Sequence, residues 1–101
     1  MSNSAQEAYN DIVAYIKECG GAYSTWYAGI TATPKQRLFT DHNVSEKDGS
    51  GGWIYRQCPT SEGARNVEKK LLEDGCDGGS GGGDNPTYVY AYQKVKGVTE
   101  P

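Results

Sequence analysis

A glycine-rich stretch near the carboxyl end sets a limit on how this chain of 101 residues can fold. Residues 75–86 hold six of the fourteen glycines. Glycine loses more conformational freedom on folding than any other residue, so this stretch cannot hold regular structure unaided and is expected to be a loop. The alternating pattern from Tyr88 to Tyr92 that follows predicts one last strand, within residues 87–95.

The beginning of the chain has the pattern of a capped amphipathic helix. Ser4 and Glu7 have the spacing of a capping box, and Gly20 supplies a stop signal. The apolar residues that recur at one-face spacing are Tyr9, Ile12, Val13 and Ile16. We therefore expect residues 1–21 to form a helix that buries one face.

Two more strands are expected in the central part of the chain, residues 22–74. Tyr, Trp, Thr and Ile dominate residues 22–31, a composition that suits a partly buried strand. Residues 53–58 form a second, shorter strand, which Pro59 ends.

A helix is predicted after each of these two strands. Thr33 has the place of an N-cap and Pro34 that of the first helical residue, so a helix should run from there to about His42. Thr60 begins the next helix, which stops at Gly75.

The resulting order of helix, strand, helix, strand, helix and strand predicts an α+β fold. A chain of 101 residues has no room for a second hydrophobic core. We expect a single domain over residues 1–101, with a small, mostly antiparallel sheet of three strands flanked by helices.

Acidic residues outnumber basic ones, with ten Lys and Arg against thirteen Asp and Glu and a net charge of −3. This balance argues against broad, non-specific attraction to nucleic acid or to an anionic membrane. A group of cations in the middle of the chain could still flank one cleft, although ordinary solvated helix faces would look the same. These cations are Lys35, Arg37, Arg56, Arg65, Lys69 and Lys70.

The sequence carries no signal for a membrane or for export. No run approaches the roughly 20 apolar residues that span a bilayer, and no basic start precedes an apolar stretch. The three cysteines, Cys19, Cys58 and Cys76, cannot all pair with one another, and none has C-x-x-C spacing. The simplest interpretation is a reduced, cytoplasmic protein without membrane association.

Glu68 is an anomaly within the helix that follows Thr60. It lies four residues after Ala64 and three before Leu71, so it projects within the apolar stripe. A carboxylate there must be paired, bound to a metal ion or lining a cleft, because an unpaired buried charge costs several kcal/mol. The alternative is that Glu68 sits at the margin of the stripe and pairs with a nearby Lys or Arg.

The segment from Trp26 to Leu38 joins a strand to a helix, with Tyr27 and Gly29 in a Tyr-x-Gly pattern and Arg37 ten residues after the tyrosine. Residues 26–72 thereby resemble the GIY-YIG nuclease family. The resemblance continues through the strand from Trp53 and into the next helix. There the family carries a metal-binding glutamate, and Glu68 lies at the corresponding place.

The resemblance implies an endonuclease that hydrolyses DNA phosphodiesters with Mg²⁺ or Mn²⁺. It implies that Tyr27 assists the nucleophile, that Arg37 binds the scissile phosphate and that Glu68 holds the metal ion. Gly29 and Lys35 are expected to contact phosphate. A cation and a carboxylate-held metal ion suit this reaction, since charge develops on the phosphate oxygens and the leaving group.

The sequence departs from the family pattern at two places. The family usually has a histidine or tyrosine four residues after the arginine, but here Asp41 has that place and His42 comes one residue later. One residue turns a side chain by about 100° around a helix, so His42 is a candidate catalytic residue that could reach the site only if the helix ends early. The family's first strand is also missing before Tyr27, so the strand of Tyr90 could fill its place in a permuted order, with Tyr90 as the first tyrosine. A tyrosine face that packs on a helix is the alternative.

These departures and the net charge of −3 leave a second hypothesis open. The chain could be a catalytically degenerate GIY-YIG-like module that binds another protein, as a small acidic inhibitor or adaptor.

Overall fold

The structure is a computed structural model that describes residues 4–41, 52–78 and 85–94. Its elements are α1 (Ala5–Glu18), the 3-10 turn η1 (Tyr23–Thr25), β1 (Trp26–Thr31), the π-helical η2 (Gln36–Asp41), β2 (Trp53–Gln57), α2 (Ser61–Asp74) and β3 (Tyr88–Gln93). The strands form one antiparallel sheet of three strands, so the α+β class is confirmed.

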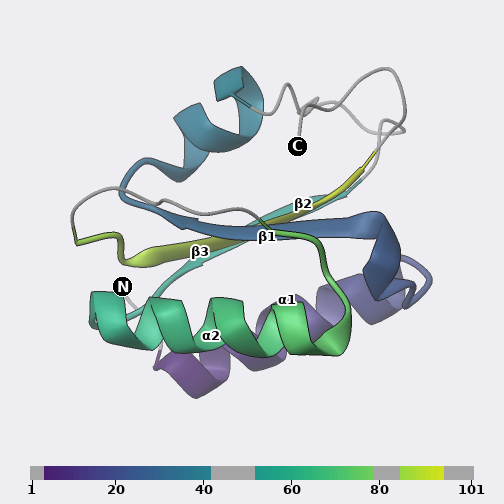
Figure 1. Ribbon diagram of the computed structural model, residues 1–101, viewed down its shortest axis with the longest axis horizontal. Coiled ribbons are helices and arrows are strands. Elements are labelled where there is room, and N and C mark those ends of the chain that lie inside the picture. Colours follow the sequence, from purple (N-terminus) through teal and green to yellow (C-terminus); the bar gives the residue numbers. More distant parts are fainter. Residues whose placement is uncertain (1–3, 42–51, 79–84, 95–101) are drawn as a thin grey trace.

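The last strand of the chain occupies the centre of the sheet, whose order is β1-β3-β2 (Figure 1). In the register, Tyr90 of β3 stands between Gly29 of β1 and Tyr55 of β2. Both neighbours of β3 therefore depend on a segment that follows the glycine-rich stretch in sequence.

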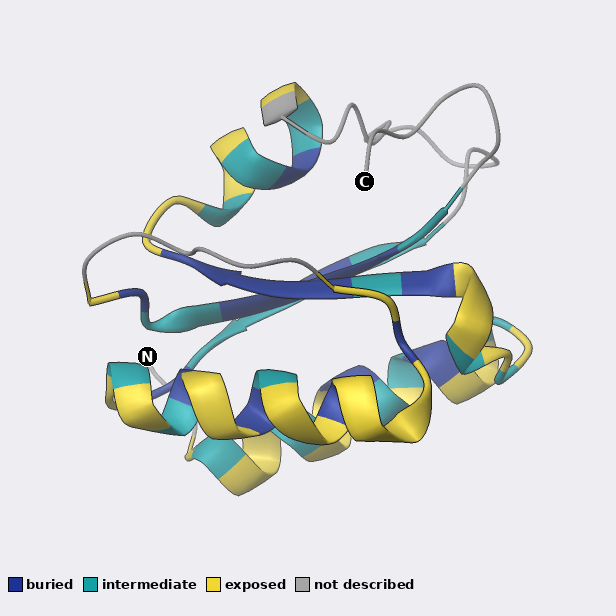
Figure 2. Ribbon diagram, viewed as in Figure 1, coloured by how far each residue is buried: buried dark blue, intermediate teal, exposed yellow. Residues whose placement is uncertain are grey.

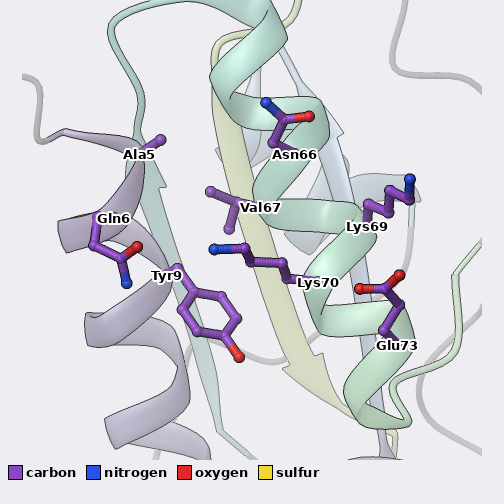
Figure 3. A pocket seen from close by; sticks show the side chains of 8 residues that line it. All are labelled: Ala5, Gln6, Tyr9, Asn66, Val67, Lys69, Lys70 and Glu73. Atoms are coloured by element: carbon purple, nitrogen blue, oxygen red, sulfur yellow. The ribbon is translucent and has the colours of Figure 1, made fainter.

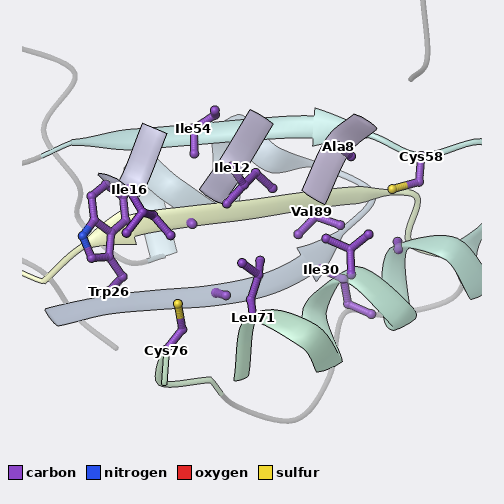
Figure 4. Close-up of a cluster of buried hydrophobic side chains, with 14 residues drawn as sticks. Ala8, Ile12, Ile16, Trp26, Ile30, Ile54, Cys58, Leu71, Cys76 and Val89 are labelled. Atoms are coloured by element: carbon purple, nitrogen blue, oxygen red, sulfur yellow. The ribbon is translucent and has the colours of Figure 1, made fainter. Parts of the chain in front are cut away.

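Helices α1 and α2 lie side by side on one face of the sheet (Figure 1). Their exposed residues lie on the side away from the sheet (Figure 2). Between helices and sheet is the main core, where side chains from α1, α2 and all three strands meet (Figure 4). Its largest members are Ile12, Ile16, Trp26, Ile30, Ile54, Leu71 and Val89.

The helix ends follow the capping signals in the sequence. The Ser4 hydroxyl accepts a hydrogen bond from the Glu7 amide at 3.1 Å, and the Glu7 carboxylate accepts one from the Ser4 amide at 3.2 Å. The Thr60 hydroxyl accepts from the Gly63 amide at 3.0 Å. Gly75 ends α2 with φ of 125°, a conformation that favours glycine.

Two predicted elements differ in the structure. The strand expected from residue 22 begins only at Trp26, because residues before it form η1, in which the Thr25 hydroxyl donates to the Ala22 carbonyl at 2.7 Å. The helix expected from Thr33 to about His42 is present over residues 34–41, and the Arg37 amide donates to the Thr33 carbonyl at 3.0 Å, as an N-cap at Thr33 requires. It differs from the expectation in that Gln36–Asp41 is π-helical.

The beginning of the predicted glycine-rich loop is not a free loop. The Ala28 amide donates to the Asp77 carbonyl, and the Asp77 amide to the Trp26 carbonyl, each at 2.8 Å. Asp77 thus covers the outer edge of β1. The remainder of that loop, residues 79–84, lies outside the described residues.

Within the described ranges, no helix combines the length and the apolar character needed to cross a bilayer.

Candidate active site

Aromatic side chains gather on the sheet face opposite α1 and α2. Because neighbours in a strand point to opposite faces, Trp26 and Ala28 enter the main core while Tyr27 points to the other side. The same alternation applies to β2 and β3. We call this surface the aromatic face; its residues are Tyr27, Trp53, Tyr55, Tyr88, Tyr90 and Tyr92.

The short helix η2 lies over the aromatic face, on the side of the sheet away from α1 and α2 (Figure 1). Leu38 anchors η2 because its side chain is fully buried against Tyr90 and Tyr92. Phe39 adds an edge-on contact to Trp53, with ring centroids 4.9 Å apart. This packing positions Arg37, whose side chain makes a hydrogen bond with the Tyr90 hydroxyl.

The Tyr90 ring crosses from the central strand over β1 at Gly29. A Cβ atom added to Gly29 would lie 2.5 Å from the Tyr90 hydroxyl oxygen and 2.6 Å from Cζ, which is closer than real contacts allow. The glycine of the Tyr-x-Gly pattern is therefore needed for packing. It lets the Tyr90 hydroxyl reach across the strand that carries Tyr27.

Both tyrosines of the site are neutral phenols at pH 7. The pKa of Tyr90 is raised to about 12, chiefly by burial and also by Tyr27, while Arg37 opposes the rise. Burial also raises the pKa of Tyr27, which Arg37 lowers and Glu68 raises. Arg37 and Glu68 thus lie within electrostatic range of both hydroxyls.

Glu68 projects from α2 as a half-buried carboxylate, between the buried Ala64 and Leu71. Burial raises its pKa, and Arg65 lowers it in part. Among the residues that the structure describes, neither Lys nor Arg forms an ion pair with Glu68, so the alternative of a structural salt bridge finds no partner there.

A divalent cation fits the chemistry of this position. Mg²⁺ is commonly held by one or two carboxylates, with water and substrate phosphate completing its shell. In residues 4–41, 52–78 and 85–94 no group of three or more His, Cys, Asp or Glu gathers, so Glu68 is the protein ligand on which such a site would depend.

The structure brings only some of the predicted site residues together. Tyr27, Arg37 and Tyr90 come together on the aromatic face, from β1, η2 and β3, whereas Glu68 belongs to α2, on the other face of the sheet, within electrostatic range of both hydroxyls. Gly29 is buried under the Tyr90 ring, which gives it a packing role in place of the expected phosphate contact. His42 lies outside the described residues.

The central cations do not all flank one cleft. Arg56 pairs with Asp11 of α1, with Nε and Oδ2 3.1 Å apart. Lys70 lies over the Tyr9 ring at 5.3 Å from its centroid. Lys35, unlike Arg56 and Lys70, lines a hollow on the aromatic face.

That hollow includes two residues that the sequence analysis did not single out as functional, Tyr55 and Tyr88. Their rings meet edge-on with centroids 6.0 Å apart. The available signal was the alternation of strand residues, which puts Tyr55 and Tyr88 on the same face as Tyr90.

Another and larger hollow lies between α1 and α2 (Figure 3). It measures about 510 Å³ and is lined by Ala5, Gln6, Tyr9, Asn66, Val67, Lys69, Lys70 and Glu73. Its central tyrosine, Tyr9, already donates a hydrogen bond to Asp74 at 2.5 Å. Tyr27, Arg37, Glu68 and Tyr90 do not line this cavity.

No family model matches this chain, and no curated protein or solved structure matches it either.

Proposed function

We propose that this chain is a metal-dependent endonuclease that hydrolyses DNA phosphodiesters at Tyr27, Arg37, Glu68 and Tyr90. The supporting observation is that the Arg37 guanidinium makes a hydrogen bond with Tyr90 beside Tyr27, with the half-buried Glu68 carboxylate in electrostatic range of both phenols. Perturbed ionisable groups that converge in this way are typical of catalytic sites.

The proposal includes a permuted relationship to the GIY-YIG family. The strand of Tyr90 pairs directly with the strand of Tyr27, although it comes last in the chain. Such pairing supports β3 as the counterpart of the family's first strand, with Tyr90 as its tyrosine.

Each residue has a role that its environment supports. Arg37 offsets negative charge on the phosphate, because a guanidinium is always protonated and donates paired hydrogen bonds. Tyr27, held as a neutral phenol by its raised pKa, donates a hydrogen bond to the attacking water, and the neutral hydroxyl of Tyr90, a residue that is 2% exposed, holds Arg37 towards the phosphate. Tyr27 therefore orients the water and does not serve as a stored phenolate base.

Glu68 would hold the divalent cation. A bound Mg²⁺ or Mn²⁺ supplies positive charge that offsets the charge developing on the phosphate and the leaving oxygen. The raised pKa of Glu68 means that burial destabilises its charged carboxylate when no cation is bound. A bound cation would offset this destabilisation.

The test is incubation of the protein with plasmid, linear and branched DNA in Mg²⁺ or Mn²⁺, beside three variants. Glu68→Gln and Arg37→Ala should abolish cleavage. Glu73→Gln is the matched control, since Glu73 is an exposed residue of the same helix that lines the distant cavity. It should cleave as the parent does.

A metal readout that needs no cleavage accompanies this assay. Mn²⁺ should raise the melting temperature of the parent and of Glu73→Gln, and leave that of Glu68→Gln unchanged. Intact DNA in every lane, from variants that are folded as well as the parent by circular dichroism, would overturn the proposed endonuclease activity. The protein-binding inhibitor or adaptor would then be tested by pull-down.

A further inference from the structure

A cleft of about 250 Å³ adjoins the site on the aromatic face. It is lined by Thr33, Pro34, Lys35, Gln36, Tyr55 and Tyr88. Tyr55 stands opposite Tyr90 in the sheet register, and Gln36 directly precedes Arg37. A molecule in the cleft would therefore lie next to a phosphate held by Arg37.

The walls of this cleft offer flat apolar surfaces. Tyr55 and Tyr88 are both partly exposed, and their ring planes meet at 68°. Tyr55 is also held parallel to Trp53, with an interplanar angle of 11° and centroids 6.2 Å apart. The Tyr55 ring is thus supported from one side by a second ring, which limits how it can turn.

The rim of the cleft is polar. Lys35 is exposed and carries a positive charge, and Thr33 and Gln36 supply donors and acceptors. Flat rings beside hydrogen-bonding groups and a cation suit a planar heteroaromatic group that is attached to an anion. A nucleobase with its phosphate has this chemistry.

We infer that the cleft holds an unpaired nucleobase next to the scissile phosphate. The substrate is then a DNA molecule that contains a single-stranded segment. This inference rests on the proposed nuclease function and specifies its substrate. A paired base is covered by its stacking neighbours on both faces and by its partner at the edge, so it must leave the duplex to enter a cleft. The net charge of −3 also disfavours a long electrostatic track along duplex DNA.

The experiment measures binding without cleavage. Glu68→Gln protein in EDTA is titrated into a short oligodeoxythymidylate that carries one 2-aminopurine, and into the same strand in a duplex. We expect fluorescence quenching on the single strand, with a Kd at least tenfold below that of the duplex. Stacking of one base on an aromatic ring is large enough to produce such a difference.

Variants of the two cleft tyrosines test which rings stack on the base. Tyr55→Ala and Tyr88→Ala should each raise the Kd for the single strand about tenfold or more. Tyr55→Phe keeps the ring and should bind as the parent does, which separates loss of stacking from loss of fold. Tyr23→Ala is the matched control, because Tyr23 lies in η1 against Gly75 and off the aromatic face.

The outcomes separate this inference from the proposed function, because the binding assay needs neither metal nor hydrolysis. Equal affinity for single strand and duplex, or equal losses of affinity in Tyr55→Ala and Tyr23→Ala, would overturn the assignment of the cleft as a base-binding site, even if the parent cleaves DNA. Ring-dependent quenching supports the cleft. If the parent then fails to cleave single-stranded DNA in Mg²⁺ or Mn²⁺, hydrolysis is overturned and the base-binding site stands.

Discussion

The hydroxyl of Tyr90 occupies the place that a side chain on Gly29 would need, since a Cβ built there falls 2.5 Å from the hydroxyl oxygen. Gly29 and Tyr90 are cross-strand partners in β1 and β3. The contact joins the first half of the chain to its last strand at the centre of the site. It gives the Tyr-x-Gly pattern a physical reason that is independent of any resemblance.

Gly29→Ala should therefore destabilise the fold by about 1–3 kcal/mol, the usual cost of overpacking. The cause is the Tyr90 ring, so the same substitution should cost much less in a Tyr90→Ala background. Urea unfolding of the parent, the two single variants and the double variant measures this coupling. Equal costs of Gly29→Ala in both backgrounds would show that the ring is not the obstacle.

A second prediction concerns the pH dependence of metal binding at Glu68. Burial raises its pKa above the ordinary value of 4.5, so the carboxylate takes up a proton at a higher pH than an exposed glutamate does. Mn²⁺ affinity, followed by calorimetric titration from pH 8 downwards, should reach half of its high-pH value at a pH above 4.5. A midpoint at or below pH 4.5 would contradict a raised pKa.

The same environment predicts the sign of a stability change. A folded-state pKa that is raised means that the proton binds the folded state more tightly, so the contribution of Glu68 to stability decreases as pH rises. Without metal at pH 7, Glu68→Gln should be as stable as the parent or more stable. The site residue is then retained at some cost in stability, and a clearly destabilised Glu68→Gln would argue for a structural role.

Local signals in the sequence predicted the long helices well. Ser4 with Glu7, Thr60 and Gly75 form their expected caps because capping depends on neighbours in sequence. The start of β1 was missed by a few residues, since the side chain of Thr25 closes a turn that composition does not reveal.

The site was predicted from spacing only in part. Tyr27, Arg37 and Glu68 follow a sequence pattern, but their nearness to Tyr90 depends on the central position of β3, which is set by non-local pairing. The cleft at Tyr55 could not be predicted, because it forms where the connection from β1 to η2 passes over two other strands.

Burial on the helix side of the sheet predicts a contrast between two neighbouring leucines. Leu71 is fully buried in the main core, whereas Leu72 is 37% exposed. Leu71→Ala should cost about 2–5 kcal/mol, because it leaves a cavity, and Leu72→Ala should cost much less. Urea unfolding of both variants compares the same chemical change at adjacent positions, and similar costs would contradict the packing of α2.

The last prediction concerns alkaline pH. Burial raises the pKa of Tyr90 to about 12 from the ordinary value of 10.0, so the folded state holds its proton more tightly than the unfolded state does. The stability that this provides is complete below about pH 10 and is lost as the pH rises towards about 12. Two pKa units correspond to about 3 kcal/mol.

Tyr90→Phe isolates this contribution, because it keeps the ring over Gly29 and removes the ionisable group. The pKa of Tyr9 is also raised to about 12, by its hydrogen bond to Asp74, so the parent should lose stability through both tyrosines. Urea unfolding at pH 8, 10 and 11 should show a smaller alkaline loss in Tyr90→Phe than in the parent. An identical loss in both proteins would mean that the Tyr90 hydroxyl reaches solvent, and its role as the buried partner that holds Arg37 would fail with it.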